Sequence, residues 1–178
     1  MHVDDIVSHL EMTSQEQLIP AAPVPEEIVL REVSDAELDV IKDVHDRLAR
    51  PFYWRSLAWG REQWLACLNK EGIRTWLADV GGEPMGLVQL HIHPGGDVEF
   101  DFFGVVPEFV GKGYGGHLLT IATRLAWSIC PDDVDTVRRV WLKTSCYDHP
   151  SAKKNYESRG YRHFHTETIP RDLVMPQT

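Results

Sequence analysis

Four glycines fall within six positions of the segment PEFVGKGYGGHLL, residues 107–119: Gly111, Gly113, Gly115 and Gly116. Glycine has no Cβ, so a ligand can approach the backbone closely at these positions. An apolar pattern of helical period follows directly, and the first amide groups of a helix lack intrahelical acceptors and carry the positive end of its dipole. The segment therefore predicts an anion site, and pyrophosphate is its natural ligand.

Two known phosphate motifs match this glycine segment incompletely. Gly111, Gly113 and Gly116 satisfy G-x-G-x-x-G, but that dinucleotide fingerprint normally lies in a unit with a parallel sheet. Here hairpin-linked strands precede the loop, and the chain ends at residue 178, which leaves little room for a nicotinamide-binding half. A Walker loop also fails, because Lys112 is followed by glycine rather than Ser or Thr.

Two carboxylates lie close together in the β-prone run DVEFDFFGVV, residues 97–106. Side chains alternate along a strand, so Glu99 and Asp101 should share one face at roughly 7 Å. Like charges at that separation raise the pKa of one partner. A carboxylate with a raised pKa is a candidate general base near pH 7, although Glu99 could equally bind a substrate ammonium or be solvated.

His91 and His93 form a His-x-His pair on the preceding run, which suggests a cupin-type metal site. Such a site needs a glutamate three or four residues later, whereas Asp97 comes after three residues and Glu99 after five. We therefore expect no metal, and we expect histidines at a hairpin end. The histidines of HFHT, residues 163–166, are likewise predicted to lie on the polar face of a final strand.

The elements that position these groups can be predicted from apolar periodicity and turn residues. GGEP and PGG separate three consecutive β-prone runs, which predicts antiparallel hairpins. Ser34 and Glu37 have the spacing of a capping box at the start of the first helix. Strands are predicted at residues 27–33, 73–80, 84–93, 97–106, 138–146 and 161–169, and helices at residues 34–48, within 51–68, after the glycine segment and at 150–160.

The composition indicates one α/β domain rather than two. The chain has 178 residues, 43% of them hydrophobic, and a net charge of −9 that disfavours nucleic acid and anionic membranes as partners. Residues 1–25, whose last part lies in PAAPVPEE (residues 20–27), are predicted to be an extended tail, with the domain at residues 26–178. Cys67, Cys130 and Cys146 are odd in number and widely spaced, which favours reduced thiols and a cytoplasmic location.

The order of these features resembles the GNAT superfamily of acyl-CoA-dependent N-acetyltransferases. The family's V-x-P-E-Y/F strand end and R/Q-x-x-G-x-G/A loop are similar to VEFDFFGVVPEF and the glycine segment, and the resemblance covers residues 27–168. The family's late A-x-x-x-Y-E-x-x-G-F segment is matched by Ala152, Tyr156, Glu157, Gly160 and Tyr161. Within the superfamily the chain is similar to a bacterial branch whose acceptor we cannot assign.

This resemblance implies a fold, a cofactor and a set of contacts. The fold is a mixed, mostly antiparallel sheet flanked by helices, with acetyl-CoA as acyl donor. The strand ending near residue 105 should separate from VWLKTSC and open a slot for the thioester. The implied cofactor-binding residues are Phe103, Gly104 and Val105 for the pantetheine arm, and Gly111, Lys112, Gly113, Tyr114, Gly115 and Gly116 for the pyrophosphate.

The resemblance also implies two catalytic roles. Tyr156 matches the family's general acid, which protonates the departing thiolate, although a buried tyrosine bonded elsewhere would give the same pattern. Glu99 occupies a strand position where some members hold a catalytic glutamate. His149 is a second candidate base, because the reference pKa of imidazole is near neutral.

Two positions depart from the family pattern. Val110 stands where the motif has Arg or Gln, which removes a side-chain contact, although Lys112 could supply charge. His149 stands where many members carry Asn.

Several functions therefore stay open at this point. The leading prediction is an N-acetyltransferase acting on a primary amine of a small molecule, and the aromatic stretch from Phe52 to Trp64 favours a cationic or aromatic amine. A non-catalytic acyl-CoA sensor, a nicotinamide-dependent oxidoreductase and a metal-dependent cupin-like enzyme are the alternatives. Formation of a homodimer and the length of the acyl group are left open.

Overall fold

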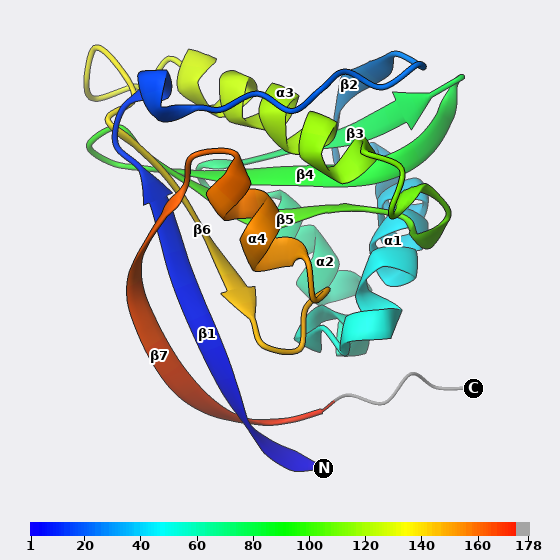
Figure 1. The fold of residues 1–178 in the computed structure, drawn as a ribbon. Helices are drawn as coiled ribbons and strands as arrows, with labels where there is room; N and C mark the ends of the chain where they lie inside the picture. Colours follow the sequence, from blue (N-terminus) through cyan, green and yellow to red (C-terminus); the bar gives the residue numbers. More distant parts are fainter. Residues whose placement is uncertain (174–178) are drawn as a thin grey trace.

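A seven-stranded sheet organises the computed structural model, which describes residues 1–173 (Figure 1). The strand order is β2-β3-β4-β5-β6-β1-β7, and every neighbouring pair is antiparallel except β5 with β6. The predicted mixed, mostly antiparallel sheet is confirmed. The strands are β1 (His2–Met12), β2 (Ile28–Val33), β3 (Ile73–Val80), β4 (Glu83–His93), β5 (Asp97–Val105), β6 (Arg139–Ser145) and β7 (Arg162–Asp172).

Helices cover both faces of this sheet (Figure 1). Leu48 of α1 packs at Gly104 on one face, and Leu118 of α3 packs at Gly86 on the other. In both places the glycine allows close approach, since an added Cβ would lie 3.2 Å from Leu48 and 3.0 Å from Leu118. The helices are α1 (Leu38–Ala49), α2 (Arg61–Leu68), α3 (Tyr114–Ser128) and α4 (Ala152–Ser158).

The start of the first helical segment differs from the predicted capping box. Ser34 accepts a hydrogen bond from the amide of Ala36 and caps a single 3₁₀ turn, Asp35–Glu37, before α1 begins. Glu37 instead accepts from Arg31 at 2.6 Å. The ion pair with β2 therefore replaces the reciprocal cap that the spacing suggested.

The prediction of an extended tail over residues 1–25 is wrong for residues 2–12, which form β1 between β6 and β7. Leu10 and Met12 are fully buried in this strand. Asp5 is also buried, and an ion pair stabilises its carboxylate, since Oδ2 lies 3.1 Å from Nε of Arg171. Its partner comes from the opposite end of the sequence, so the acidic start of the chain concealed a core strand.

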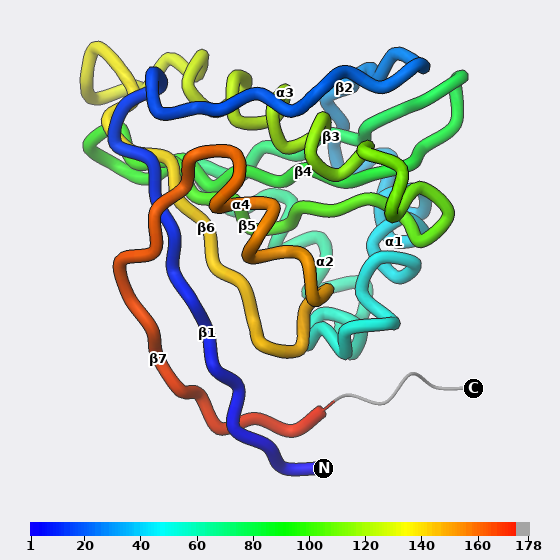
Figure 2. Tube along the Cα trace, viewed as in Figure 1, coloured from blue at the N-terminus to red at the C-terminus, as the bar shows by residue number. Residues whose placement is uncertain are grey.

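Both ends of the described chain thus close one side of the sheet. Figure 2 traces β1 and β7 side by side, and the amide of Leu173 donates to the carbonyl of Met1. Residues 18–27 have no strand or α-helix and cross α3, where the amide of Ala21 donates to Thr120. No helix among residues 1–173 is long and apolar enough to cross a membrane.

The parallel pairing of β5 with β6 is short. It joins only residues 97–100 to residues 139–142, and the strands separate beyond Phe100. This is the separation that the family resemblance implied. A bulge begins at the same place, because Phe100 pairs with Leu90 and Phe102 with Gln89, which leaves Asp101 as the extra residue.

Candidate active site

Two cavities meet where β5 and β6 separate. The first, here called the loop cavity, has a volume of about 340 Å³ and reaches the glycine segment. The second, here called the sheet cavity, has a volume of about 360 Å³ and extends toward β7. Trp54, Phe103, Asp148 and Tyr156 border both cavities. The two spaces are therefore adjacent and are together called the passage, with these four side chains at its middle.

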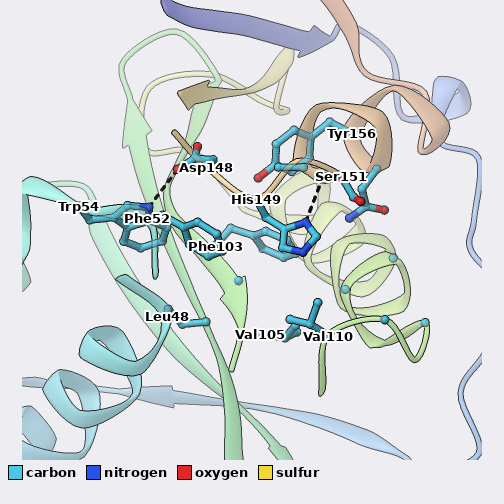
Figure 3. A pocket seen from close by; sticks show the side chains of 17 residues that line it. Leu48, Phe52, Trp54, Phe103, Val105, Val110, Asp148, His149, Ser151 and Tyr156 are labelled. Carbon is cyan, nitrogen blue, oxygen red and sulfur yellow. Dashed lines mark hydrogen bonds between the residues drawn. The ribbon is translucent and has the colours of Figure 1, made fainter. Parts of the chain in front are cut away.

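The loop cavity contains most of the predicted cofactor-binding residues (Figure 3). Phe103, Gly104 and Val105 line one side, and Gly111, Gly113, Gly115 and Gly116 line the other. The remaining two residues, Lys112 and Tyr114, are not among its lining residues. Tyr114 is buried against Phe109 and its hydroxyl donates to Glu26, so its side chain is directed away from the cavity.

The glycine segment presents free amides to this cavity. None of the amides from Gly111 to Gly116 donates a hydrogen bond of normal geometry to another residue in the described part of the chain, whereas the amide of His117 begins the pairing of α3 by donating to Gly113. Gly111 and Gly113 have φ values of 79° and 86°, in the left-handed region. An added Cβ at Gly111 would meet nothing within 4 Å. Free amides, open space and the positive end of a helix dipole fit a pyrophosphate.

Arg159 brings a positive charge to the same loop. Its Nη1 lies 2.9 Å from the position that a Cβ would take at Gly116, so glycine is needed for this approach. Among residues 1–173 its guanidinium forms no ion pair, and its Nε is buried without a hydrogen-bond partner. Arg159 was not predicted, because it lies far from the loop in sequence. It supplies charge where Val110 replaces the family's Arg or Gln.

Tyr156 lies at the junction of the two cavities and is 8% exposed. Figure 3 shows its hydroxyl pointing into the space bordered by Asp148 and Phe103. Burial raises the pKa of the phenol well above its ordinary value, and the negative charge of Asp148 raises it further. The hydroxyl is therefore protonated at neutral pH and can donate a hydrogen bond or a proton.

Asp148 and Trp54 join the two walls of the passage. The indole Nε1 of Trp54 donates to Oδ1 of Asp148 at 3.0 Å. The other carboxylate oxygen accepts from the hydroxyl of Thr144 and the amide of Ser145, which fixes Asp148 at the end of β6. Neither residue was predicted as a site residue, since nothing in the local sequence connects positions 54 and 148.

The sheet cavity is bordered by charged side chains, and Asp101 differs from the others. It forms no ion pair and no hydrogen bond with another described residue. Asp101 is an exposed residue, but partial loss of solvent around its carboxyl raises its pKa, and the negative charge of Glu99 raises it further. The bulge in β5 brings it to the cavity, because Phe100, Asp101, Phe102 and Phe103 all line the space in succession.

Glu99 lies beside Asp101 but is differently placed. It is buried, accepts a hydrogen bond from Nε2 of His93 at 3.0 Å, and lies 3.6 Å from Nζ of Lys143. Glu99 is not among the residues that line either cavity. The rise in pKa that two neighbouring carboxylates were expected to cause is found on Asp101.

His149 lines the loop cavity rather than the sheet cavity. Its Nδ1 accepts a hydrogen bond from the amide of Ser151, and its ring meets Phe52 edge to face. His149, the second candidate base from the sequence, therefore lies at the cavity predicted to bind the acyl donor.

A buried hydrogen-bond chain supports the wall of the sheet cavity. Ser56 lines this cavity and lies 2.6 Å from Nε2 of His45, whose Nδ1 lies 2.9 Å from Asp46. Burial lowers the pKa of His45, so the ring is neutral, donates through Nδ1 to Asp46 and accepts from the Ser56 hydroxyl. The chain ties α1 to the aromatic segment, of which Trp54 and Trp59 reach the cavity while Trp64 is fully buried.

Comparisons with known proteins agree with this arrangement. The model of the Acetyltransferase (GNAT) family matches residues 41–161, which is more than half of the chain, so the protein belongs to that family. The predicted family and fold class are confirmed. No curated protein sequence matches the chain.

Solved structures share the fold at low sequence identity. A functionally unknown conserved protein from Staphylococcus epidermidis is 21% identical with a TM-score of 0.65, over 97% of this chain and 64% of that one. A GCN5-related N-acetyltransferase from Sphaerobacter thermophilus is 20% identical with a TM-score of 0.69, over 100% of this chain and 54% of that one. AAC(6')-Iy, in complex with the bisubstrate analogue CoA-S-monomethyl-acetylneamine, is 16% identical with a TM-score of 0.54, over 75% of this chain and 90% of that one. The chain thus spans less than two thirds of the first two proteins.

Proposed function

We propose that this protein transfers an acetyl group from acetyl-CoA to a primary amine of a small molecule. The loop cavity would bind the donor and the sheet cavity the acceptor. One observation carries the proposal: a cradle of free amides and a buried tyrosine lie along a single passage that leads to an unpaired carboxylate. The family supports acetyl transfer in general, and the AAC(6')-Iy complex is a precedent for a coenzyme A group and an amine-derived group on this fold.

The backbone of β5 supports binding of the pantetheine arm. Beyond Phe100 the edge of β5 that faced β6 has lost its partner strand, so peptide groups at Phe103, Gly104 and Val105 can pair with amides of the donor. The pyrophosphate would then lie at the amides of Gly111–Gly116, near Arg159. Leu48, Phe52 and Trp54 provide apolar contacts along the way.

Acetyl-CoA supplies an activated thioester. The protein must accept a proton from the incoming ammonium and donate a proton to the departing thiolate. An amine attacks only when neutral, so Asp101 would accept the proton of the incoming ammonium. Tyr156 would donate its hydroxyl proton toward the sulfur as the thiolate departs, since its raised pKa keeps that proton in place at neutral pH. The new C–N bond forms as the C–S bond breaks. The nitrogen then loses its second proton, which restores the phenol of Tyr156, and Asp101 releases the first proton to solvent, so both products leave neutral at the reacting atoms.

The geometry supports Asp101 as the proton acceptor more strongly than Glu99, the residue predicted from the sequence. Asp101 borders the sheet cavity and has no competing partner among the described residues, whereas Glu99 is already bound by His93 and Lys143. In the proposed mechanism Glu99 acts through its charge, by raising the pKa of Asp101.

The lining of the sheet cavity favours a cationic acceptor. The carboxylates of Asp101 and Glu167 border it, as do the indole rings of Trp54 and Trp59. Carboxylates and aromatic faces are the groups that bind alkylammonium ions in proteins. Arg55, Lys143 and Arg171 border the same cavity, although Arg171 pairs with Asp5 and Lys143 lies 3.6 Å from Glu99. An amine with one positive charge beside Asp101 and the indole rings therefore fits this lining best.

The test combines binding with turnover. Isothermal titration with coenzyme A should give saturable binding, and titration with NAD should give none. A panel of polyamines, aminoglycosides and amino-acid amides, followed by thiol release from acetyl-CoA, should identify an acceptor. Binding of coenzyme A without turnover of any amine would support a non-catalytic acyl-CoA sensor, and absence of coenzyme A binding would refute the proposal.

A further inference from the structure

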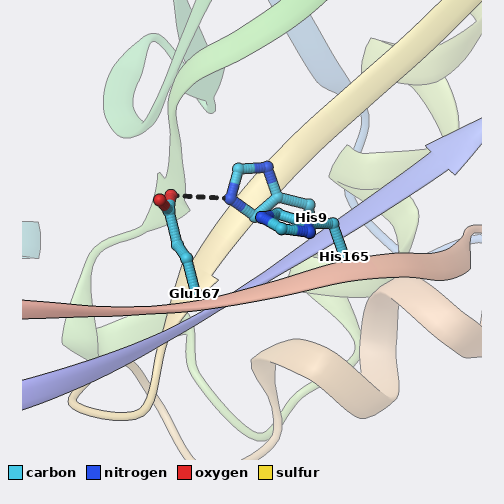
Figure 4. Close-up of side chains that lie close together, drawn as sticks. All are labelled: His9, His165 and Glu167. Atoms are coloured by element: carbon cyan, nitrogen blue, oxygen red, sulfur yellow. Dashed lines mark hydrogen bonds and ion pairs between the residues drawn. The ribbon is translucent and has the colours of Figure 1, made fainter.

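Three metal-ligating side chains converge on β1 and β7 beside the sheet cavity, which one of them, Glu167, also borders. His9 of β1 pairs across the strands with His165 of β7, and Glu167 follows two residues later on the same side of β7. Figure 4 shows the two imidazole rings and the carboxylate gathered over this pair of strands. Their ligand atoms all lie within 4.8 Å of one another. Because paired strands fix the three Cα positions, little rearrangement is needed to bring these atoms together.

From this juxtaposition we propose that His9, His165 and Glu167 bind one divalent transition-metal ion of the zinc class. Two imidazole nitrogens and one carboxylate oxygen form a known zinc ligand set, in which water completes the coordination. In a tetrahedral site with bonds of about 2.0–2.1 Å the ligand atoms lie roughly 3.3 Å apart. The 2.8 Å separation of His9 Nε2 and Glu167 Oε1 is close to that value, so small rotations suffice.

The charges around the cluster also suit a cation. The cluster contains one carboxylate, that of Glu167, and no Lys or Arg among the described residues forms an ion pair with it. Lys143, which pairs with His9 across β1 and β6, is the competing cation, but its ammonium lies 3.6 Å from Glu99 and above the ring of Trp141.

Water can reach this cluster. The side chain of Glu167 is 39% exposed and His165 is an exposed residue, so solvent molecules can occupy the remaining coordination positions. The ring of His9 is held between Trp141 on one side and His165 on the other, which orients one ligand in advance.

A second cluster on the same sheet, His91, His93 and Glu99, has similar spacing but a different environment. The side chain of Glu99 is only 8% exposed, and its two oxygens face His93 and Lys143. A metal ion there would have to displace the ammonium from a buried carboxylate. The exposed cluster on β1 and β7 is therefore the one that we assign.

Binding at this site would tie the edge strand β7 to β1. An ion that binds the folded chain alone raises its stability, so the melting temperature of the chelator-treated protein should increase on addition of zinc. This expectation does not depend on the proposed acetyl transfer.

The experiment uses the full chain after chelation, titrated with Zn²⁺ in equilibrium dialysis and with Co²⁺ by visible absorption. One ion per chain should bind with saturation. The visible absorption of bound Co²⁺ should be more intense than that of the hydrated ion, because the protein site is not octahedral. His165→Ala and Glu167→Gln should each weaken binding at least about tenfold. His163→Ala is the matched control, because His163 is on the same strand but bonds to Thr166 instead, and its affinity should be unchanged.

Several results would overturn the assignment. The first is equal metal affinity in wild type, His165→Ala and Glu167→Gln. The second is loss of binding in His93→Ala but not in His165→Ala. The third is absence of saturable binding at millimolar metal. Circular dichroism of each variant shows whether the fold is retained, and Glu167→Gln, which preserves the shape of the side chain, separates loss of a ligand from loss of structure.

Discussion

The two cavities of this protein are built by different means. One side of the loop cavity is formed by residues that are close in sequence, from the end of β5 through the glycine segment to the start of α3, and these offer mainly main chain. Side chains of α1, the aromatic segment and the region of α4 complete it. The sheet cavity is formed by side chains, many of them charged, from β1, the aromatic segment, β5, β6 and β7. A ligand group bound by backbone amides depends on chain geometry, whereas one bound by side chains depends on which residues the fold brings together.

This difference suggests a division of specificity. In the proposed function the loop cavity would recognise what every acyl-CoA shares, a diphosphate and a chain of amides, and main-chain groups suffice for this. The sheet cavity must distinguish one amine from others, which requires side chains of particular charge and shape. Tyr156, Trp54, Phe103 and Asp148 border both spaces, and substitutions there should affect both ligands.

Removal of the Tyr156 hydroxyl should have the largest effect on turnover. Tyr156→Phe is expected to lower kcat by on the order of 100-fold, because proton donation to the departing sulfur is lost. The affinity for coenzyme A should be nearly unchanged, as measured by titration calorimetry. Tyr161→Phe is the matched control, since Tyr161 is also buried but its hydroxyl bonds to Thr123. Equal turnover in wild type and Tyr156→Phe would remove the tyrosine from the acid role.

A negative charge in the loop cavity should act on the donor alone. Gly115→Glu is expected to weaken binding of coenzyme A about 100-fold, equivalent to ~2.7 kcal/mol, because a carboxylate enters the anion site. An added Cβ at this position would lie 3.9 Å from the nearest atom, in Asn155, so the fold should be retained and Gly115→Ala should bind normally. Unchanged affinity in Gly115→Glu would place the diphosphate elsewhere.

The pH dependence should distinguish Asp101 from Glu99. The pKa of Asp101 is raised, so the acidic limb of kcat/KM for the amine should lie above the range of an ordinary aspartate, with activity rising as Asp101 loses its proton. Asp101→Asn should abolish this limb and reduce kcat/KM about tenfold. Glu99→Gln removes a negative charge that raises the pKa of Asp101, so the limb should move to lower pH. A limb that persists in Asp101→Asn would assign the base to another residue.

Substitutions of two tryptophans should have the smallest effects on activity, but they best separate the roles of the two cavities. Trp54→Phe loses the hydrogen bond to Asp148, worth ~1 kcal/mol, and should reduce kcat/KM about fivefold for both substrates, since Trp54 borders both cavities. Trp59 borders the sheet cavity and not the loop cavity. Trp59→Phe should therefore alter KM for the amine alone, and equal effects on both substrates would weaken the division proposed above.

Most elements were predictable because their signals are local. The hairpins joining β3, β4 and β5 follow from the turn residues between them, and the buried face of α3 follows from its apolar period. β1 was missed for the opposite reason. Its buried Asp5 is stabilised by Arg171, and its neighbours β6 and β7 come from the other end of the chain, so no short window could show that the strand is needed.

The site divides in the same way. Seven of the nine predicted cofactor residues line one cavity, because a single segment carries them. Arg159, Trp54 and Asp148 were not predicted, since each contributes by meeting residues distant in sequence. The sequence predicted that Glu99 and Asp101 lie close together, but the bulge that turns Asp101 toward the cavity depends on the register of β5 against β4.

The amino-acid sequence alone determined the order of most elements, the glycine segment before α3 and the tyrosine segment, because backbone conformation depends mainly on neighbouring residues. The tertiary structure alone decided which carboxylate faces the cavity, which arginine approaches the loop and where the first strand lies. Those outcomes depend on contacts between residues far apart in the chain, and their energies exist only once the sheet has assembled.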